Sequence, residues 1–126
     1  MIRRLGPIAL IGALILTACG GGGESTTVEG QNVTVLMFDN RYEYTEIRIP
    51  PGGTVNFVGG GRNPHNAVAN DESWSTEDAF GSLEQYEGDE ATVAFDTAGE
   101  YPFFCTFHGN SEGAGMVGTV IVEAAG

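Results

Sequence analysis

The sequence contains no lysine, and its 5 arginines face 17 aspartates and glutamates, so the formal net charge is -12. Such an acidic chain repels phosphate backbones, and we expect no nucleic-acid partner. Only 2 of the 126 residues are cysteines, too few for a disulfide framework or a four-cysteine metal site. Long stretches with helical periodicity are missing as well, because prolines and 20 glycines divide the apolar residues into short runs. This spacing excludes a long helical bundle and favours one small β domain plus a tail.

The longest apolar run, residues 5–16, follows two arginines near the N-terminus. It is shorter than the roughly 20 residues of a bilayer-spanning helix but has the length of a signal-peptide core. The run ends in Leu16-Thr17-Ala18-Cys19, which resembles the lipobox of bacterial lipoproteins; the alternative is an ordinary signal peptide with a chance cysteine. We predict a lipoprotein signal peptide at residues 1–18, lipidation of Cys19, a flexible tether at residues 19–30, and a location on the periplasmic or extracellular face of a membrane.

Residues 31–126 are predicted to form one domain of short strands. Apolar and polar residues alternate in Tyr44–Ile49 and again in Thr54–Val58, and the Pro-Pro-Gly-Gly sequence between them is typical of a turn. Similar patterns predict further strands at residues 31–38, 66–69, 91–95, 100–105 and 116–123, with a Gly-rich loop at 106–115. About seven strands with regular turns predict an all-β fold, a Greek-key β-sandwich.

The acidic segment at residues 70–90 shows no clear periodicity. Four bulky residues interrupt its acids: Trp74, Phe80, Leu83 and Tyr86. Two interpretations stay open, a solvated loop with a helical turn pinned by its aromatic residues, or an acidic docking patch. The role of the acidity of the whole domain is similarly open, since an acidic surface fits a basic redox partner, adaptation to high salt, or solubility alone.

Four side chains able to bind a soft metal fall in predicted loops or at strand ends: His65, Cys105, His108 and Met116. If Cys19 is acylated, Cys105 has no cysteine partner and is either an inert buried thiol or a ligand. Each residue has an ordinary packing explanation when taken alone. Together, a Cys-x-x-His motif, a Gly-rich segment leading to a methionine and an upstream histidine predict a metal site. Two imidazoles, one thiolate and a weak thioether form the ligand set of one blue (type 1) copper ion.

Two segments around these residues resemble a known family. Asn63-Pro64-His65-Asn66 is similar to the first-ligand segment of the cupredoxins, the blue copper proteins of the plastocyanin, amicyanin and halocyanin group. Residues 101–108 and 113–118 resemble the closing segment of that family. The resemblance covers residues 31–123, and it implies a monomeric sandwich of seven to eight strands with copper at one end.

The resemblance also implies roles for residues beside the ligands. Asn66 would bond to the backbone or hydroxyl of Thr106 and so join the two ligand segments, unless it only satisfies its own turn. Electrons would leave through the edge of His108, within an apolar patch formed by Pro64, Phe107, Gly109 and Ala114.

The closing segment departs from the family in three places. Seven residues separate His108 from Met116, more than in plastocyanin or amicyanin. Phe107 replaces the proline of plastocyanin, and Phe104 replaces its tyrosine. Docking is therefore expected to differ from that of plastocyanin.

These observations predict a membrane-tethered blue-copper protein that carries single electrons between extracytoplasmic redox partners, such as a cytochrome, an oxidase or a photosynthetic or respiratory complex. Such a carrier is not an enzyme. The alternative is a copper-binding protein for delivery or storage, although the Met or His clusters typical of that class are missing. A catalytic copper domain would need more histidines than 2. The presence of all four metal ligands argues against a metal-free adhesion domain.

Overall fold

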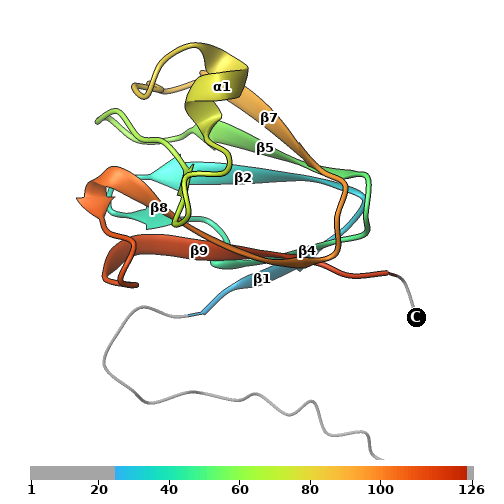
Figure 1. Ribbon diagram of the computed structural model, residues 1–126. Coiled ribbons are helices and arrows are strands. Elements are labelled where there is room, and N and C mark those ends of the chain that lie inside the picture. Colours follow the sequence, from blue (N-terminus) through green and yellow to red (C-terminus); the bar gives the residue numbers. More distant parts are fainter. Residues whose placement is uncertain (1–24, 125–126) are drawn as a thin grey trace, which may run out of the picture.

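The computed structural model describes residues 25–124. Within this range the chain forms two stacked β-sheets and one short helix, α1 (Thr76–Phe80) (Figure 1). The first sheet has the order β1 (Thr27–Glu29), β4 (Glu46–Ile49), β9 (Gly115–Val122), β8 (Gly99–Gly109) and β6 (Val68–Ala69). The second has the order β3 (Arg41–Tyr42), β2 (Asn32–Phe38), β5 (Gly53–Gly59) and β7 (Glu90–Phe95). The predicted all-β sandwich is confirmed.

The core lies between the two sheets because alternate residues of each strand face inward. In β5 every second residue is buried, including Val55 and Phe57, and β9 shows the same pattern through Val120 and Val122. Phe57 and Phe103 meet edge to face with ring centroids 5.4 Å apart. This rigid interior holds the ends of β8 and β9 in place, at the left of Figure 1.

Several boundaries differ from the predicted ones. The described residues contain nine strands, where seven to eight were expected. The additional strands are short: β1 falls inside the predicted tether, and β3 has two residues, too few for alternation to reveal. β8 continues to Gly109, through residues predicted to be loop, because Gly109 pairs with Gly115 of β9.

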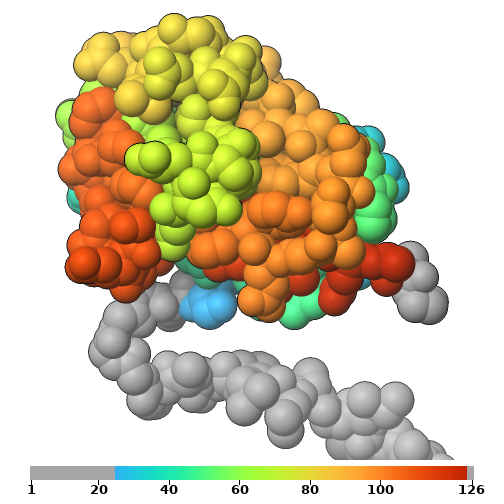
Figure 2. All heavy atoms as spheres, viewed as in Figure 1, coloured from blue at the N-terminus to red at the C-terminus, as the bar shows by residue number. Residues whose placement is uncertain are grey.

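The acidic segment contains the predicted helical turn, α1, but its aromatic residues do not all anchor it. Trp74 packs against the core and stacks on Phe57 with ring centroids 5.9 Å apart. Phe80 and Tyr86 are instead exposed. In Figure 2 the yellow-green segment before α1 lies on the front face of the molecule, below the yellow atoms of α1.

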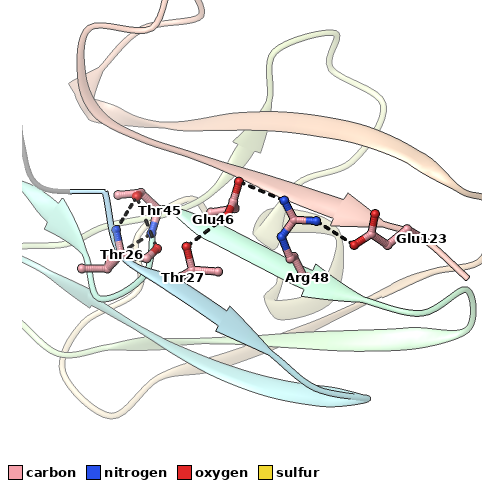
Figure 3. A network of polar contacts seen from close by, with 6 residues as sticks. All are labelled: Thr26, Thr27, Thr45, Glu46, Arg48 and Glu123. Carbon is pink, nitrogen blue, oxygen red and sulfur yellow. Dashed lines mark hydrogen bonds and ion pairs between the residues drawn. The ribbon is translucent and has the colours of Figure 1, made fainter. Parts of the chain in front are cut away.

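β1 is attached to the edge of the first sheet by parallel pairing with β4 and by side chains (Figure 3). Thr26 and Thr45 exchange backbone-to-hydroxyl bonds of 3.0 and 3.3 Å, and the Thr27 hydroxyl donates to Glu46 at 3.0 Å. Arg48 bridges Glu46 and Glu123 at 3.4 and 2.6 Å. The chain is therefore fixed to the sandwich from about residue 26 onward.

The predicted signal peptide at residues 1–18, the lipidation site Cys19 and residues 19–24 of the predicted tether lie outside the described residues. Between residues 25 and 124, the structure contains no helix with the length and apolar character needed to cross a bilayer.

Candidate metal centre

Three of the four predicted ligands converge in space. The donor atoms of His65, Cys105 and His108 all lie within 4.8 Å of one another. The Cys105 Sγ atom is 3.9 Å from His65 Nδ1, and the two imidazole rings have centroids 5.0 Å apart. Cys105 is a free thiol with no exposed surface, and His65 is equally buried.

The convergence depends on an irregularity in the pairing of β8 with β9. Regular pairing reaches Phe104 opposite Val117 and resumes only at Gly109 opposite Gly115. Residues 105–108 of β8 therefore face a single residue of β9, Met116. Such a bulge changes the direction of side chains, which lets Cys105 and His108 contribute to one site from one strand.

Met116 is the single β9 residue opposite this bulge, and it is 1% exposed. Its backbone lies against Gly109, where an added Cβ would be 2.5 Å from the Met116 carbonyl oxygen. Gly115 has a φ of +79°, and a Cβ there would be 2.2 Å from the carbonyl oxygen of His108. Glycine is needed at both positions for the two strands to close around the ligands.

The enlarged ligand loop between His108 and Met116 is folded on itself. The Asn110 side-chain oxygen accepts from the backbone N–H groups of Glu112 and Ala114 at 3.0 and 3.2 Å. From outside the loop, the Asn70 side chain donates to the Ser111 carbonyl at 3.1 Å. The additional residues therefore form a hydrogen-bonded turn that is tied to Asn70.

His65 is held from both sides by groups that the sequence did not reveal. Its backbone exchanges two hydrogen bonds, of 3.0 and 3.1 Å, with the backbone of Gln85, a fully buried residue of the acidic segment. Its ring Nε2 bonds to Asp39 Oδ1 at 2.9 Å. Both partners are distant in sequence and belong to polar segments, so no local pattern identifies them.

The Asp39 carboxylate determines which nitrogen of His65 is free. The hydrogen bond from His65 and the backbone N–H of Asn63 lower the pKa of Asp39 to about 2. An ionised carboxylate only accepts, so this hydrogen bond requires a proton on His65 Nε2. The other ring nitrogen, Nδ1, faces the Cys105 sulfur.

His108 has a complementary feature. Its Nδ1 atom is buried and has no hydrogen-bond partner among the described residues, although the ring as a whole is half-buried. An unpaired buried nitrogen costs free energy unless something binds it. A metal ion would satisfy this nitrogen, and His65, Cys105 and His108 are the residues that would hold it; two imidazoles and a thiolate are a donor set that fits copper.

Asn66 lies directly after His65 and joins the two ligand segments. Its Nδ2 donates to the Thr106 hydroxyl at 2.8 Å and to the Leu83 carbonyl at 2.9 Å, and its Oδ1 accepts from the Thr106 backbone N–H at 2.9 Å. The Tyr42 hydroxyl donates to the Asn66 carbonyl at 2.6 Å. Burial raises the pKa of Tyr42, so this hydroxyl remains a donor.

The residues of the predicted exit patch differ in exposure. Phe107 and Ala114 are exposed, with 46% of Phe107 accessible, while Pro64 and Gly109 are half-buried. An exposed phenylalanine is thus adjacent in sequence to the His108 ligand candidate.

Comparison with known proteins places this site in a family. The sequence pattern described as "Copper binding proteins, plastocyanin/azurin family" matches residues 21–123. The chain is 36% identical to the plastocyanin of Scenedesmus fuscus over 65% of this chain and 86% of that protein. It is 37% identical to the amicyanin of Paracoccus versutus over 76% and 68%, respectively. It is also 38% identical to the chloroplastic plastocyanin of Tetradesmus obliquus, of which it spans 58%.

Solved structures show the same fold. The amicyanin structure from Paracoccus versutus is similar with a TM-score of 0.55 and 27% identity, over 76% of this chain and 85% of that one. A copper-containing nitrite reductase from Thermus scotoductus SA-01 has a TM-score of 0.60 at 24% identity, but the match covers only 24% of the reductase. The second likeness concerns the fold alone. With its His-Cys-His cluster at the end of a two-sheet sandwich, the chain belongs to the plastocyanin/azurin family of copper binding proteins.

Proposed function

We propose that this chain is a membrane-tethered blue-copper protein that carries single electrons between extracytoplasmic redox partners. His65, Cys105 and His108 would hold one copper ion, with Met116 as a weak fourth ligand. Bound copper supplies one-electron chemistry through its Cu(I) and Cu(II) states. The protein residues orient the donors, exclude water and transform no substrate.

The observation that carries this proposal is the prearranged, buried state of the donors. Cys105 and His65 have no exposed surface, and separate partners hold the segments around them: Asp39, Gln85 and Asn66. A site fixed in this way changes little when the charge of its ion changes. Little rearrangement means a small barrier to electron transfer, which is what a carrier requires.

Copper delivery or storage is the competing function, and the geometry disfavours it. A delivery site needs exposed, exchangeable ligands, whereas two of the three donors here are fully buried. A catalytic role is disfavoured because both histidines of the chain lie in one cluster. None remains for a second copper centre such as an oxidase or reductase would use.

The proposal also includes a membrane anchor and redox partner proteins. The lipobox-like sequence before Cys19 supports export and a lipid anchor on the periplasmic or extracellular face. Exposed Phe107 and Ala114 beside the half-buried His108 support an exit path for electrons at this end. The net charge of -12 fits partners with basic docking surfaces as well as it fits high salt or solubility alone, and we expect the carrier to act as a monomer.

The test is the optical spectrum of the purified protein with Cu(II). We expect a strong thiolate-to-copper charge-transfer band in the orange-red, and its complete loss in Cys105→Ala, because only a coordinated thiolate gives this transition. Thr97→Ala is the matched control, since it removes an exposed hydroxyl in the turn between β7 and β8 and leaves the thiol and its neighbours unchanged. A weak ligand-field spectrum and rapid loss of copper to a chelator would instead establish a delivery protein.

A further inference from the structure

Asp39 is a carboxylate outside both ligand segments that nevertheless reaches a ligand candidate. It follows β2 at the turn into β3, and its Oδ1 lies 2.9 Å from His65 Nε2. The same carboxylate accepts from the backbone N–H groups of Asn63 and Arg62, at 3.1 and 3.3 Å. These two residues belong to the connection that leads from β5 to His65, so Asp39 binds both the ring and the segment that carries it.

Gly61 shows that the close contact between this connection and Asp39 is built into the sequence. A Cβ at Gly61 would lie 2.3 Å from Asp39 Oδ1 and 2.9 Å from the Asp39 backbone nitrogen. No side chain fits in that space. The connection can therefore pass directly over the carboxylate only because residue 61 is glycine.

His108 provides an internal comparison. Its Nδ1 has no partner among residues 25–124, and within the same range the one histidine paired with a carboxylate is His65. The two imidazoles are thus electrostatically different, because only His65 has an anion on the side of the ring opposite its free nitrogen. A carboxylate behind a histidine ligand fixes the tautomer and increases the basicity of the ligating nitrogen.

We propose that Asp39 is a positioning residue for His65, which holds Nε2 protonated, directs Nδ1 toward Cys105 and, through its negative charge, favours Cu(II) over Cu(I). This inference rests on the proposed ligation of copper by His65. The charge acts on the metal through the ring, and a dication gains more than a monocation from an anion at the same distance. Asp39 therefore lowers the reduction potential of the bound copper.

The experiment compares three variants of the full chain. Asp39→Asn keeps an oxygen acceptor but removes the charge, Asp39→Ala removes both, and Asp96→Asn removes one charge elsewhere. Asp96 is exposed in the turn between β7 and β8. About 20 Å of strand separates that turn from Cys105, at roughly 3.3 Å per residue, so this variant is the matched control.

Two measurements are made. In the metal-free protein, ¹⁵N NMR identifies the protonated nitrogen of His65; we expect Nε2–H in the wild type and a mixture of tautomers in Asp39→Ala. With copper, we expect Asp39→Asn to lose about tenfold more affinity for Cu(II) than for Cu(I). That ratio corresponds to a rise of about 59 mV in reduction potential. Asp96→Asn should match the wild type in both measurements.

The outcomes separate this inference from the proposed function. If the wild type gives no charge-transfer band, the blue-copper function is wrong, while the NMR result still tests the positioning of His65. If the wild type is blue but Asp39→Asn has the potential of Asp96→Asn, the electrostatic role of Asp39 is wrong. A wild-type His65 protonated at Nδ1 in the metal-free protein would overturn the positioning role.

Discussion

At the scale of single residues, Met116, the proposed weak fourth ligand, is the side chain whose effect is most easily separated from folding. Met116 is buried and is the only β9 residue opposite the bulge at Cys105–His108. A thioether at the axial position of a His₂Cys site adjusts the potential of copper without being required to hold it. Its chemistry and its packing can therefore be tested independently.

Met116→Leu should keep the blue colour and shift the reduction potential. The substitution nearly conserves volume, so the free energy of unfolding of the metal-free protein should change by less than about 1.5 kcal/mol. Spectroscopy, potentiometry and urea unfolding measure the three quantities. Loss of copper binding in a variant that unfolds normally would contradict a tuning role for Met116.

At the scale of elements, the site depends on a bond between two segments rather than on either one. Asn66 belongs to the connection between β5 and β6, and Thr106 belongs to β8, 40 positions later. The two hydrogen bonds between Asn66 and Thr106 form a bridge between these segments. Since His65 precedes Asn66 and Cys105 precedes Thr106, the bridge fixes the spacing of two ligand candidates.

Asn66→Ala should destabilise the metal-free protein by about 3 kcal/mol, because it removes three partly buried hydrogen bonds at about 1 kcal/mol each. Thr106→Val removes only the hydroxyl and keeps the backbone N–H, so we expect a loss of about 1 kcal/mol. Urea unfolding followed by Trp74 fluorescence measures both. Equal losses in the two variants would show that the bridge contributes nothing beyond the hydroxyl contact.

At the scale of the whole molecule, an acidic domain follows an N-terminal segment that includes the apolar run of residues 5–16. The chain enters the sandwich at β1, which pairs with β4 at the edge of the first sheet and is held there by hydrogen bonds of Thr26 and Thr27. A tether that emerges there would let the ligand end of the sandwich turn toward partners. This arrangement depends on the proposed lipid anchor at Cys19.

Cells that express the full chain with an alkyne-labelled fatty acid should incorporate the label into the wild type but not into Cys19→Ser. The reason is that acylation requires the thiol of the residue after the cleavage site. Cys105→Ser is the matched control, since it removes the other cysteine of the chain and should leave labelling unchanged. Labelling that persists in Cys19→Ser would exclude the anchor.

Much of the fold and part of the site can be predicted from the sequence because their signals are local. Alternation with a period of two identifies β5 and β9 without knowledge of their partners. The chemical nature of a thiol, two imidazoles and a thioether is likewise a property of single residues. The Cys105-to-His108 spacing, the Gly-rich segment before Met116 and the upstream His65 together predict a metal site.

Only the tertiary structure decided how these residues meet and what supports them. The bulge that directs Cys105 and His108 into one site arises from the pairing of β8 with β9. The bond from His65 to Asp39 spans 26 positions, and Gln85 lies 20 residues beyond His65 in a segment without periodicity. The chemistry of each side chain and the alternation of apolar and polar residues are local properties, so the sequence alone determines them. The pairing of distant strands depends on the packing of the whole chain, so no local pattern predicts it.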